Sequence, residues 1–180
     1  MKKRTGGAAV ALVAVISIAL LASAAWLGAG AVKRRGLEKG TEALAAGDYA
    51  QAAAYLERAE KFSLRADAAV LTALGEAREG LGDGAAAKEC YSLAVKADGA
   101  HAKARYKLAM IYIKEKNFEA ARSEVAALEK LGTGEAAGYA RELKKEVQLG
   151  SVKSIFDGIV DKVLPELGFG DKPAESGDAR

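Results

Sequence analysis

The chain of 180 residues contains few of the side chains that catalytic and metal centres use. It has one cysteine, Cys90, and one histidine, His101, which exclude an internal disulfide, a multi-cysteine zinc site and a histidine-rich metal centre. With two prolines and 20 glycines in no three-residue period, it is neither collagen-like nor proline-rich. Apolar residues make up 51% of the chain, too many for a wholly disordered protein. We therefore expect a folded protein without cofactor or metal.

The net charge of +3 comes from the beginning of the chain. Six basic residues, Lys2–Arg4 and Lys33–Arg35, precede residue 36, and residues 36–180 sum to −3. Nucleic-acid binding needs a basic face on the folded domain. The sequence shows none, so we expect no nucleic-acid partner.

An uncharged run extends from Thr5 to Val32. Its apolar part, residues 8–32, would span roughly 37 Å as a helix, against about 30 Å for the hydrocarbon core of a bilayer. We expect residues 1–32 to be a signal anchor with one transmembrane helix in the inner (cytoplasmic) membrane. Basic residues flank the run on both sides, and its signal-like start favours an extracytoplasmic position for the following domain.

Two other interpretations of this run stay open. It could be a signal peptide, cleaved after Ala22-Ser23-Ala24 or after Ala29-Gly30-Ala31, which would release a secreted or periplasmic protein. It could also be a buried helix of a soluble domain. The first alternative predicts a mature chain shorter than the sequence.

A repeat of 34 to 35 residues occupies the middle of the chain. Residues 47–52, 82–87 and 116–121 align at offsets of 35 and 34 residues. The same offsets relate four further sets of positions: Gly40, Gly75 and Ala109; Ala52, Ala87 and Ala121; Leu56, Tyr91 and Val125; Ala59, Ala94 and Leu128. Such agreement indicates a repeated structural unit.

Each unit is expected to form a helix, a short turn and a second helix. The turns contain Gly47-Asp48, Gly82-Asp83 and Lys116-Asn117, where Gly or Asn suits the end of a helix and Asp or Asn can cap the next one. No β-branched run alternates with a period of two, so the pattern predicts an all-α fold. Small residues such as Gly75 and Ala87 would let paired helices approach, and Tyr49, Tyr91 and Phe118 would fill the space around the crossings.

These positions resemble the tetratricopeptide repeat (TPR) family over about residues 33–135. The family places a small residue in the first helix and two alanines in the second, which here correspond to Gly40, Ala52 and Ala59, then to Gly75, Ala87 and Ala94. In the third repeat Leu128 departs from alanine, and the usual proline between repeats is missing. The resemblance implies a short α-solenoid of three helix hairpins over residues 33–149, including a capping helix at 136–149.

A second helical segment is expected after the cap, over residues 150–169. Gly150 and Ser151 should interrupt the cap helix, and an amphipathic helix should follow, with its apolar face between Val152 and Leu167. This helix could pack on the repeats or dock on a partner. Residues 170–180 have the composition of a disordered tail.

No residue pattern predicts catalysis. His101 lies in a turn without an adjacent nucleophile, and Cys90 falls in the packing register of a helix. The glycine-rich residues 80–84 lie between helices, whereas a phosphate loop follows a strand. A small enzyme that uses Cys90 or His101 is an alternative of low weight.

The resemblance implies a peptide-binding groove lined by the first helix of each repeat. Tyr106, Met110 and Ile113 recur at i, i+4 and i+7 on a side of their helix away from Leu108 and Ala109. We predict a groove formed by Thr72, Glu76, Lys103, Tyr106, Met110 and Ile113. Alternatively, the helix at 152–167 fills this space. TPR domains that clamp acidic C-terminal peptides use Lys and Asn where this chain has Leu37 and Thr41, which argues against that activity.

Together these observations predict a non-enzymatic, membrane-tethered adaptor. It would hold a protein or peptide partner, such as part of a membrane complex, at a raised effective concentration. A secreted TPR protein and self-association of the chain are the alternatives.

Overall fold

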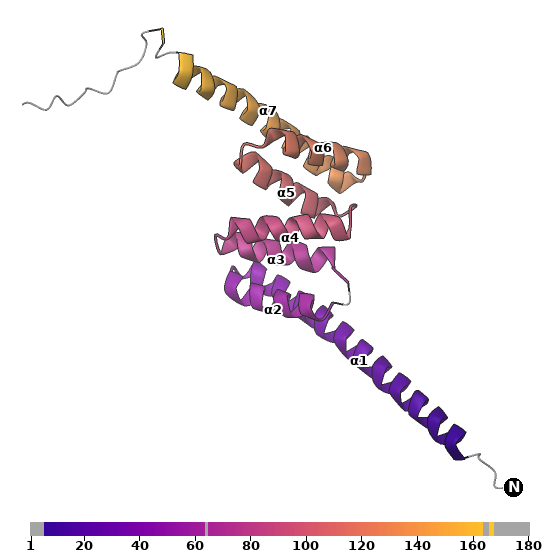
Figure 1. The fold of residues 1–180 in the computed structure, drawn as a ribbon. Helices are drawn as coiled ribbons and strands as arrows, with labels where there is room; N and C mark the ends of the chain where they lie inside the picture. Colours follow the sequence, from indigo (N-terminus) through magenta and orange to yellow (C-terminus); the bar gives the residue numbers. More distant parts are fainter. Residues whose placement is uncertain (1–5, 64, 164–165, 168–180) are drawn as a thin grey trace, which may run out of the picture. The chain divides into compact units, whose positions relative to one another are not determined.

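The computed structural model describes residues 6–63, 65–163 and 166–167, without the side chains of residues 6–14, 20–27 and 163. All regular structure in this part of the chain is α-helical, as predicted (Figure 1). The chain divides into two compact units, Met1–His101 and Ala102–Arg180.

The first unit consists of two helix pairs, and a short turn joins the two helices of each pair. Its helices are α1 (Gly6–Ala45), α2 (Tyr49–Lys61), α3 (Ala68–Gly80) and α4 (Gly84–Ala97). Helix α1 packs on α2 and α3 packs on α4, while α3 also contacts both helices of the first pair. The second pair therefore lies against the first pair.

The second unit contains one further pair and a long last helix. Its helices are α5 (Ala102–Lys114), α6 (Phe118–Leu131) and α7 (Gly134–Val163). Helix α7 packs on α6 and on α5. Ala136, Ala140, Leu143 and Val147 of α7 are buried, so α7 covers the apolar side of this pair.

The turns within the pairs form as the sequence predicts. The carboxylates of Asp48 and Asp83 accept hydrogen bonds of 3.0 Å from the N–H groups three residues later, and the Asn117 amide oxygen accepts the equivalent bond at 3.2 Å. Gly47 and Gly82 take the left-handed conformation with φ of 76° and 82°. The third turn places Lys116 there, at φ of 58°, which costs a residue with a Cβ about 1 kcal/mol.

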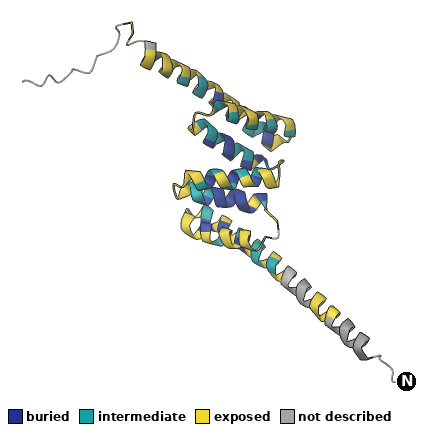
Figure 2. Ribbon diagram, viewed as in Figure 1, coloured by how far each residue is buried: buried dark blue, intermediate teal, exposed yellow. Residues whose placement is uncertain are grey.

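Glycines in the first helix of a pair leave room for large side chains of the second helix. A methyl group on Gly40 would lie 2.5 Å from Cγ of Leu56, and one on Gly75 would lie 2.5 Å from Cε1 of Tyr91. Leu56 and Tyr91 are both completely buried. Figure 2 shows that buried residues gather on the packed helices of this unit. The predicted packing of small against large residues is therefore confirmed for these two pairs.

The hydroxyl of Tyr91 keeps a polar partner although its ring is buried. It donates a hydrogen bond of 3.1 Å to Oε2 of Glu79. Burial, and then the nearby Glu79 carboxylate, raise the pKa of Tyr91. The phenol therefore stays neutral at physiological pH, which is the form that this core requires.

Two aromatic residues each pack against a glycine of the next helix along the chain. Tyr49 of α2 lies against Gly80 of α3, and a methyl group on Gly150 of α7 would lie 2.7 Å from Cε1 of Phe118 of α6. The second contact shows why the predicted helix break at Gly150-Ser151 is wrong. Gly150 makes room for a ring, and α7 continues through it to Val163.

The predicted membrane anchor needs correction. In the described part of the chain, none of the helices has both the length and the apolar character that crossing a bilayer requires. This finding contradicts the transmembrane helix expected within residues 1–32 and the single-pass placement in the inner membrane. Many of the side chains on which that expectation rested, at residues 8–14 and 20–27, lie outside the described residues.

Helix α1 continues without interruption from the apolar run into the first helix pair. The ammonium of Lys33 lies 2.5 Å from the carboxylate of Asp67, the residue that caps α3. Partial burial acts to raise the pKa of Asp67, but Lys33 and two backbone N–H groups outweigh it and lower the pKa. The basic residues after the apolar run thus belong to the folded unit.

The last turns of α7 expose the apolar face predicted there. Val152, Ile155 and Phe156 are 62 to 65% exposed, and Ile159 is 48% exposed. We call these four residues the α7 stripe. The predicted disordered tail, residues 170–180, lies outside the described residues.

Replacing Gly75 by alanine tests the packing of small against large residues. We expect Gly75→Ala to lower the free energy of unfolding by about 1–3 kcal/mol, because the added methyl group meets the buried ring of Tyr91. The matched control is Gly138→Ala on α7, where nothing lies within 4 Å of the new methyl group. It should be neutral or raise stability by up to about 1 kcal/mol. Urea unfolding measures both, and equal stability of the two variants would contradict the expected clash.

Candidate functional site

A pair of stacked tyrosines lies between α5 and α7 in the second unit. The ring centroids of Tyr106 and Tyr139 are 4.5 Å apart, with 23° between the ring planes. The Tyr106 hydroxyl donates a hydrogen bond of 2.7 Å to Glu142, and the Tyr139 hydroxyl donates one of 3.0 Å to Glu135. Both rings are half-buried. The stack is therefore held by the protein and still reachable from solvent.

Carboxylates give this face a negative character. The hydrogen bond to Glu142, followed by burial and by the charges of Glu142 and Glu146, raises the pKa of Tyr106 to about 12. Glu135, Glu142 and Glu146 are all exposed. A ligand on this face would meet aromatic rings beside acidic groups.

Three other residues of the predicted groove lie on α5. Met110 and Ile113 are half-buried and pack on the apolar cluster that Ala109, Ala140 and Leu143 help to form. Lys103 is exposed near the start of the helix. Within the second unit, the structure thus brings Tyr106, Met110 and Ile113 to the side of α5 that α7 partly covers.

The two remaining predicted residues lie on α3, in the first unit. Thr72 is only 2% exposed, and its hydroxyl donates a hydrogen bond of 2.6 Å to the carbonyl oxygen of Ala68 in the same helix. Glu76 is half-buried, and its charge contributes to the raised pKa of Tyr91. The assignment of the six residues to a peptide groove stays a prediction.

Sequence reasoning missed the contribution of α7 to this face. The sequence predicted a capping helix at 136–149 and gave its residues no part in the groove. The signal that could have found the pair is the 33-residue spacing between Tyr106 and Tyr139, close to the repeat period. The alternative in which residues 152–167 fill the groove fails for the α7 stripe, because its side chains are exposed.

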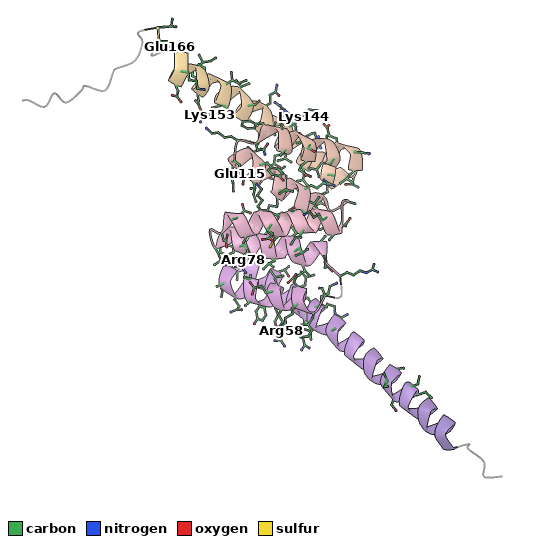
Figure 3. All side chains as sticks on the ribbon, in the orientation of Figure 1. Arg58, Arg78, Glu115, Lys144, Lys153 and Glu166 are labelled. Carbon is green, nitrogen blue, oxygen red and sulfur yellow. The ribbon has the colours of Figure 1, made fainter. Side chains whose placement is uncertain are left out.

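An ion pair joins α5 to α6, the second helix that packs on it. The guanidinium of Arg105 lies 2.6 Å from Glu124 of α6, and both side chains are less than one-fifth exposed. A more exposed ion pair between Arg78 and Glu57 joins α3 to α2. Figure 3 shows Arg78 on α3 and the exposed Lys144 and Lys153 on α7. The two ion pairs therefore help to hold α3 and α5 against neighbouring helices.

The two residues considered for catalysis lie in helix α4 and in the turn that follows it. Cys90 is half-buried, and burial raises the pKa of its thiol, which disfavours the nucleophilic thiolate. The backbone N–H of His101 donates to the carbonyl oxygen of Asp98 in a turn. Among the described residues there is no group of three or more His, Cys, Asp or Glu side chains able to hold a metal ion.

Comparison with protein families identifies the repeats. The family described as tetratricopeptide repeat matches residues 68–101 and 102–130. These segments contain the α3–α4 and α5–α6 pairs. No curated protein matches the sequence.

Solved structures with a similar fold are TPR domains. The first TPR domain of human RPAP3 has 18% identity and a TM-score of 0.56, covering 67% of this chain and 95% of its own. The TPR domain of Arabidopsis OM64 has 19% identity and a TM-score of 0.54, covering 63% and 95%. The TPR domain of Sgt2 from Aspergillus fumigatus has 20% identity and a TM-score of 0.56, covering 82% and 89%. At these identities the likeness shows the fold.

The raised pKa of Tyr106 gives a spectroscopic test of the tyrosine face. We expect tyrosinate absorbance to show one group that ionises near pH 12, because ionisation breaks the hydrogen bond to Glu142 and places two negative charges together. Tyr106→Phe should remove this transition, and Glu142→Gln should move it to lower pH. Tyr112→Phe is the matched control on the same helix. Tyr91, whose pKa is also raised, keeps its own ionisation in Tyr106→Phe. The same number of tyrosines ionising near pH 12 in Tyr106→Phe as in the unsubstituted chain would contradict the geometry.

Proposed function

We propose that the chain binds a peptide segment of a partner protein on the α5–α7 face. Residues 68–101 and 102–130 match the tetratricopeptide repeat family, whose members typically serve as protein–protein interaction modules. The α5–α7 face comprises Lys103, Tyr106, Met110 and Ile113 of α5 with Tyr139 of α7. Thr72 and Glu76 are left out of the proposal, because Thr72 is buried and both belong to the other unit.

The stacked tyrosines carry this proposal. Aromatic residues are enriched in protein interfaces because they offer a large, rigid contact area with few rotatable bonds. The Tyr106 and Tyr139 rings are already fixed by stacking and by hydrogen bonds to carboxylates, so little conformational entropy is lost when a ligand packs on them.

The charges beside the rings indicate the chemistry of the ligand. Glu135, Glu142 and Glu146 are exposed around the stack. An extended segment with an apolar side chain for the rings and a Lys or Arg for the carboxylates fits this face. This preference is opposite to that of the TPR domains that clamp acidic C-terminal peptides.

Selection from a random peptide library on the full chain tests the proposal. We expect selected peptides to pair an apolar residue with Lys or Arg, and to bind roughly tenfold or more weakly to Tyr106→Ala and to Met110→Gln. The control is Leu81→Ser, which removes an apolar side chain that is 50% exposed in the α3–α4 turn. Unfolding temperatures show whether each variant is folded. Selected peptides that bind all four proteins equally would contradict the assignment.

The α7 stripe favours a second interaction, with another copy of the chain. Val152, Ile155 and Phe156 face solvent, while Gly150 on another side of the helix faces Phe118. The charged residues among the last turns, Lys153, Asp157, Asp161 and Lys162, sum to zero, so two such helices would pair without net repulsion. We infer that two stripes pack together as a helix pair.

Sedimentation equilibrium measures this association. Phe156→Ser should weaken it by roughly 10- to 100-fold, because a large apolar side chain loses its burial. Lys153→Ser, which changes a charged residue beside the stripe, is the matched control and should leave the association constant nearly unchanged. A wild-type chain that stays monomeric at every concentration would contradict the pairing.

A further inference from the structure

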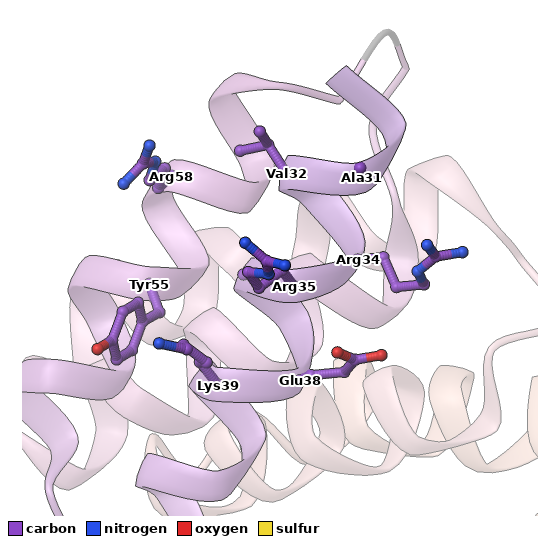
Figure 4. A pocket seen from close by; sticks show the side chains of 9 residues that line it. Ala31, Val32, Arg34, Arg35, Glu38, Lys39, Tyr55 and Arg58 are labelled. Atoms are coloured by element: carbon purple, nitrogen blue, oxygen red, sulfur yellow. The ribbon is translucent and has the colours of Figure 1, made fainter. Parts of the chain in front are cut away.

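A basic hollow lies between α1 and α2 in the first unit. Its volume is about 610 Å³, and its charged and aromatic lining residues are Arg34, Arg35, Glu38, Lys39, Tyr55 and Arg58. Four cations and one carboxylate give the lining an excess of positive charge. In Figure 4, Arg35, Lys39, Tyr55 and Arg58 lie together on one side, and Arg34 and Glu38 lie on the other.

The close approach of the two helices at Gly36 sets this geometry. A methyl group on Gly36 would lie 2.9 Å from both the carbonyl oxygen of Tyr55 and Cβ of Ala59. The backbones therefore come near enough for Arg35 and Lys39 of α1 to share a hollow with Tyr55 and Arg58 of α2. The ammonium of Lys39 lies 5.5 Å from the centre of the Tyr55 ring, a favourable cation–π distance.

Among the described residues, Arg35 and Arg58 lack the glutamate partners that several other cations have. Arg78, Arg105 and Lys144 each pair with a glutamate. Across the described ranges, the structure gives no ion pair for Arg35 or Arg58. Arg35 and Lys39 are also four residues apart on one helix face, where like charges repel and destabilise the helix slightly. A bound anion would relieve this repulsion.

We propose that the hollow binds the phosphate group of a small phosphorylated molecule. A phosphate monoester carries nearly two negative charges at neutral pH, which matches the excess of cations better than one carboxylate does. Arginine binds phosphate oxygens through two parallel N–H groups, and Arg35 and Arg58 supply this chemistry from two helices. The volume falls within the roughly 300–1,000 Å³ of small-molecule sites. The site is separate from the α5–α7 face and does not depend on it.

Calorimetric titration of the full chain with phenyl phosphate tests the site, with benzoate as the carboxylate of similar shape. At fixed ionic strength we expect saturable one-to-one binding of phenyl phosphate and much weaker binding of benzoate. Arg35→Gln and Arg58→Gln should each weaken phenyl phosphate binding about tenfold, the effect of losing one charge-assisted hydrogen-bonding group. Both arginines are exposed, so the substitutions should leave the fold intact, and unfolding temperatures check this.

The matched control is Arg65→Gln, an exposed arginine of the same unit that does not line the hollow. It should retain wild-type affinity within about twofold, since it contributes only to the general field of the protein. An equal loss in Arg65→Gln and Arg35→Gln would overturn the site, as would equal affinity for benzoate or the absence of saturable binding. Binding of a phosphoserine peptide without binding of phenyl phosphate would overturn the small-molecule assignment.

Discussion

The structure depends on the close approach of paired helices at positions that carry almost no side chain. At Gly40 and Gly75 a methyl group would lie 2.5 Å from Leu56 and Tyr91, the large residues that fill the pair interiors. Removing these side chains from water supplies the main stabilisation, and the glycines let the backbones close around them. A helix glycine costs roughly 1 kcal/mol of intrinsic propensity, which the buried ring or Leu side chain offsets.

Close approach at glycines also positions the surfaces to which we assign a function. Gly36 brings α1 against α2 and so gathers the arginines of the basic hollow, while Gly150 admits Phe118 and lets α7 run on into an exposed apolar stripe. In the second unit, α7 also completes the tyrosine stack with α5. Interaction surfaces thus arise from helices that the cores hold in place, which suits a module acting through binding.

The repeat period predicted the helix pairs, their capped turns and their glycine crossings, because those features repeat and depend on neighbours in sequence. The length of the uncharged run and its flanking basic residues predicted a membrane helix at residues 8–32, which the structure contradicts. Gly150 indicated a helix break, but α7 continues through it. The glycine makes room for the ring of Phe118, which lies 32 residues earlier in the sequence. The Tyr106–Tyr139 stack was missed for the same reason, since it joins two helices whose contact is set by packing. The assignment of Thr72, Glu76 and the α5 residues to one groove stays a prediction.

Native-state hydrogen exchange of backbone amides tests most directly whether the glycine crossings hold the fold together. Amides around Gly40, Leu56, Gly75 and Tyr91 should exchange only through the largest opening of the first unit, because they lie where large side chains enter the paired helices. Amides in the exposed last turns of α7 should exchange much faster. Rapid exchange at the crossings, with slow exchange elsewhere in the same unit, would contradict this account.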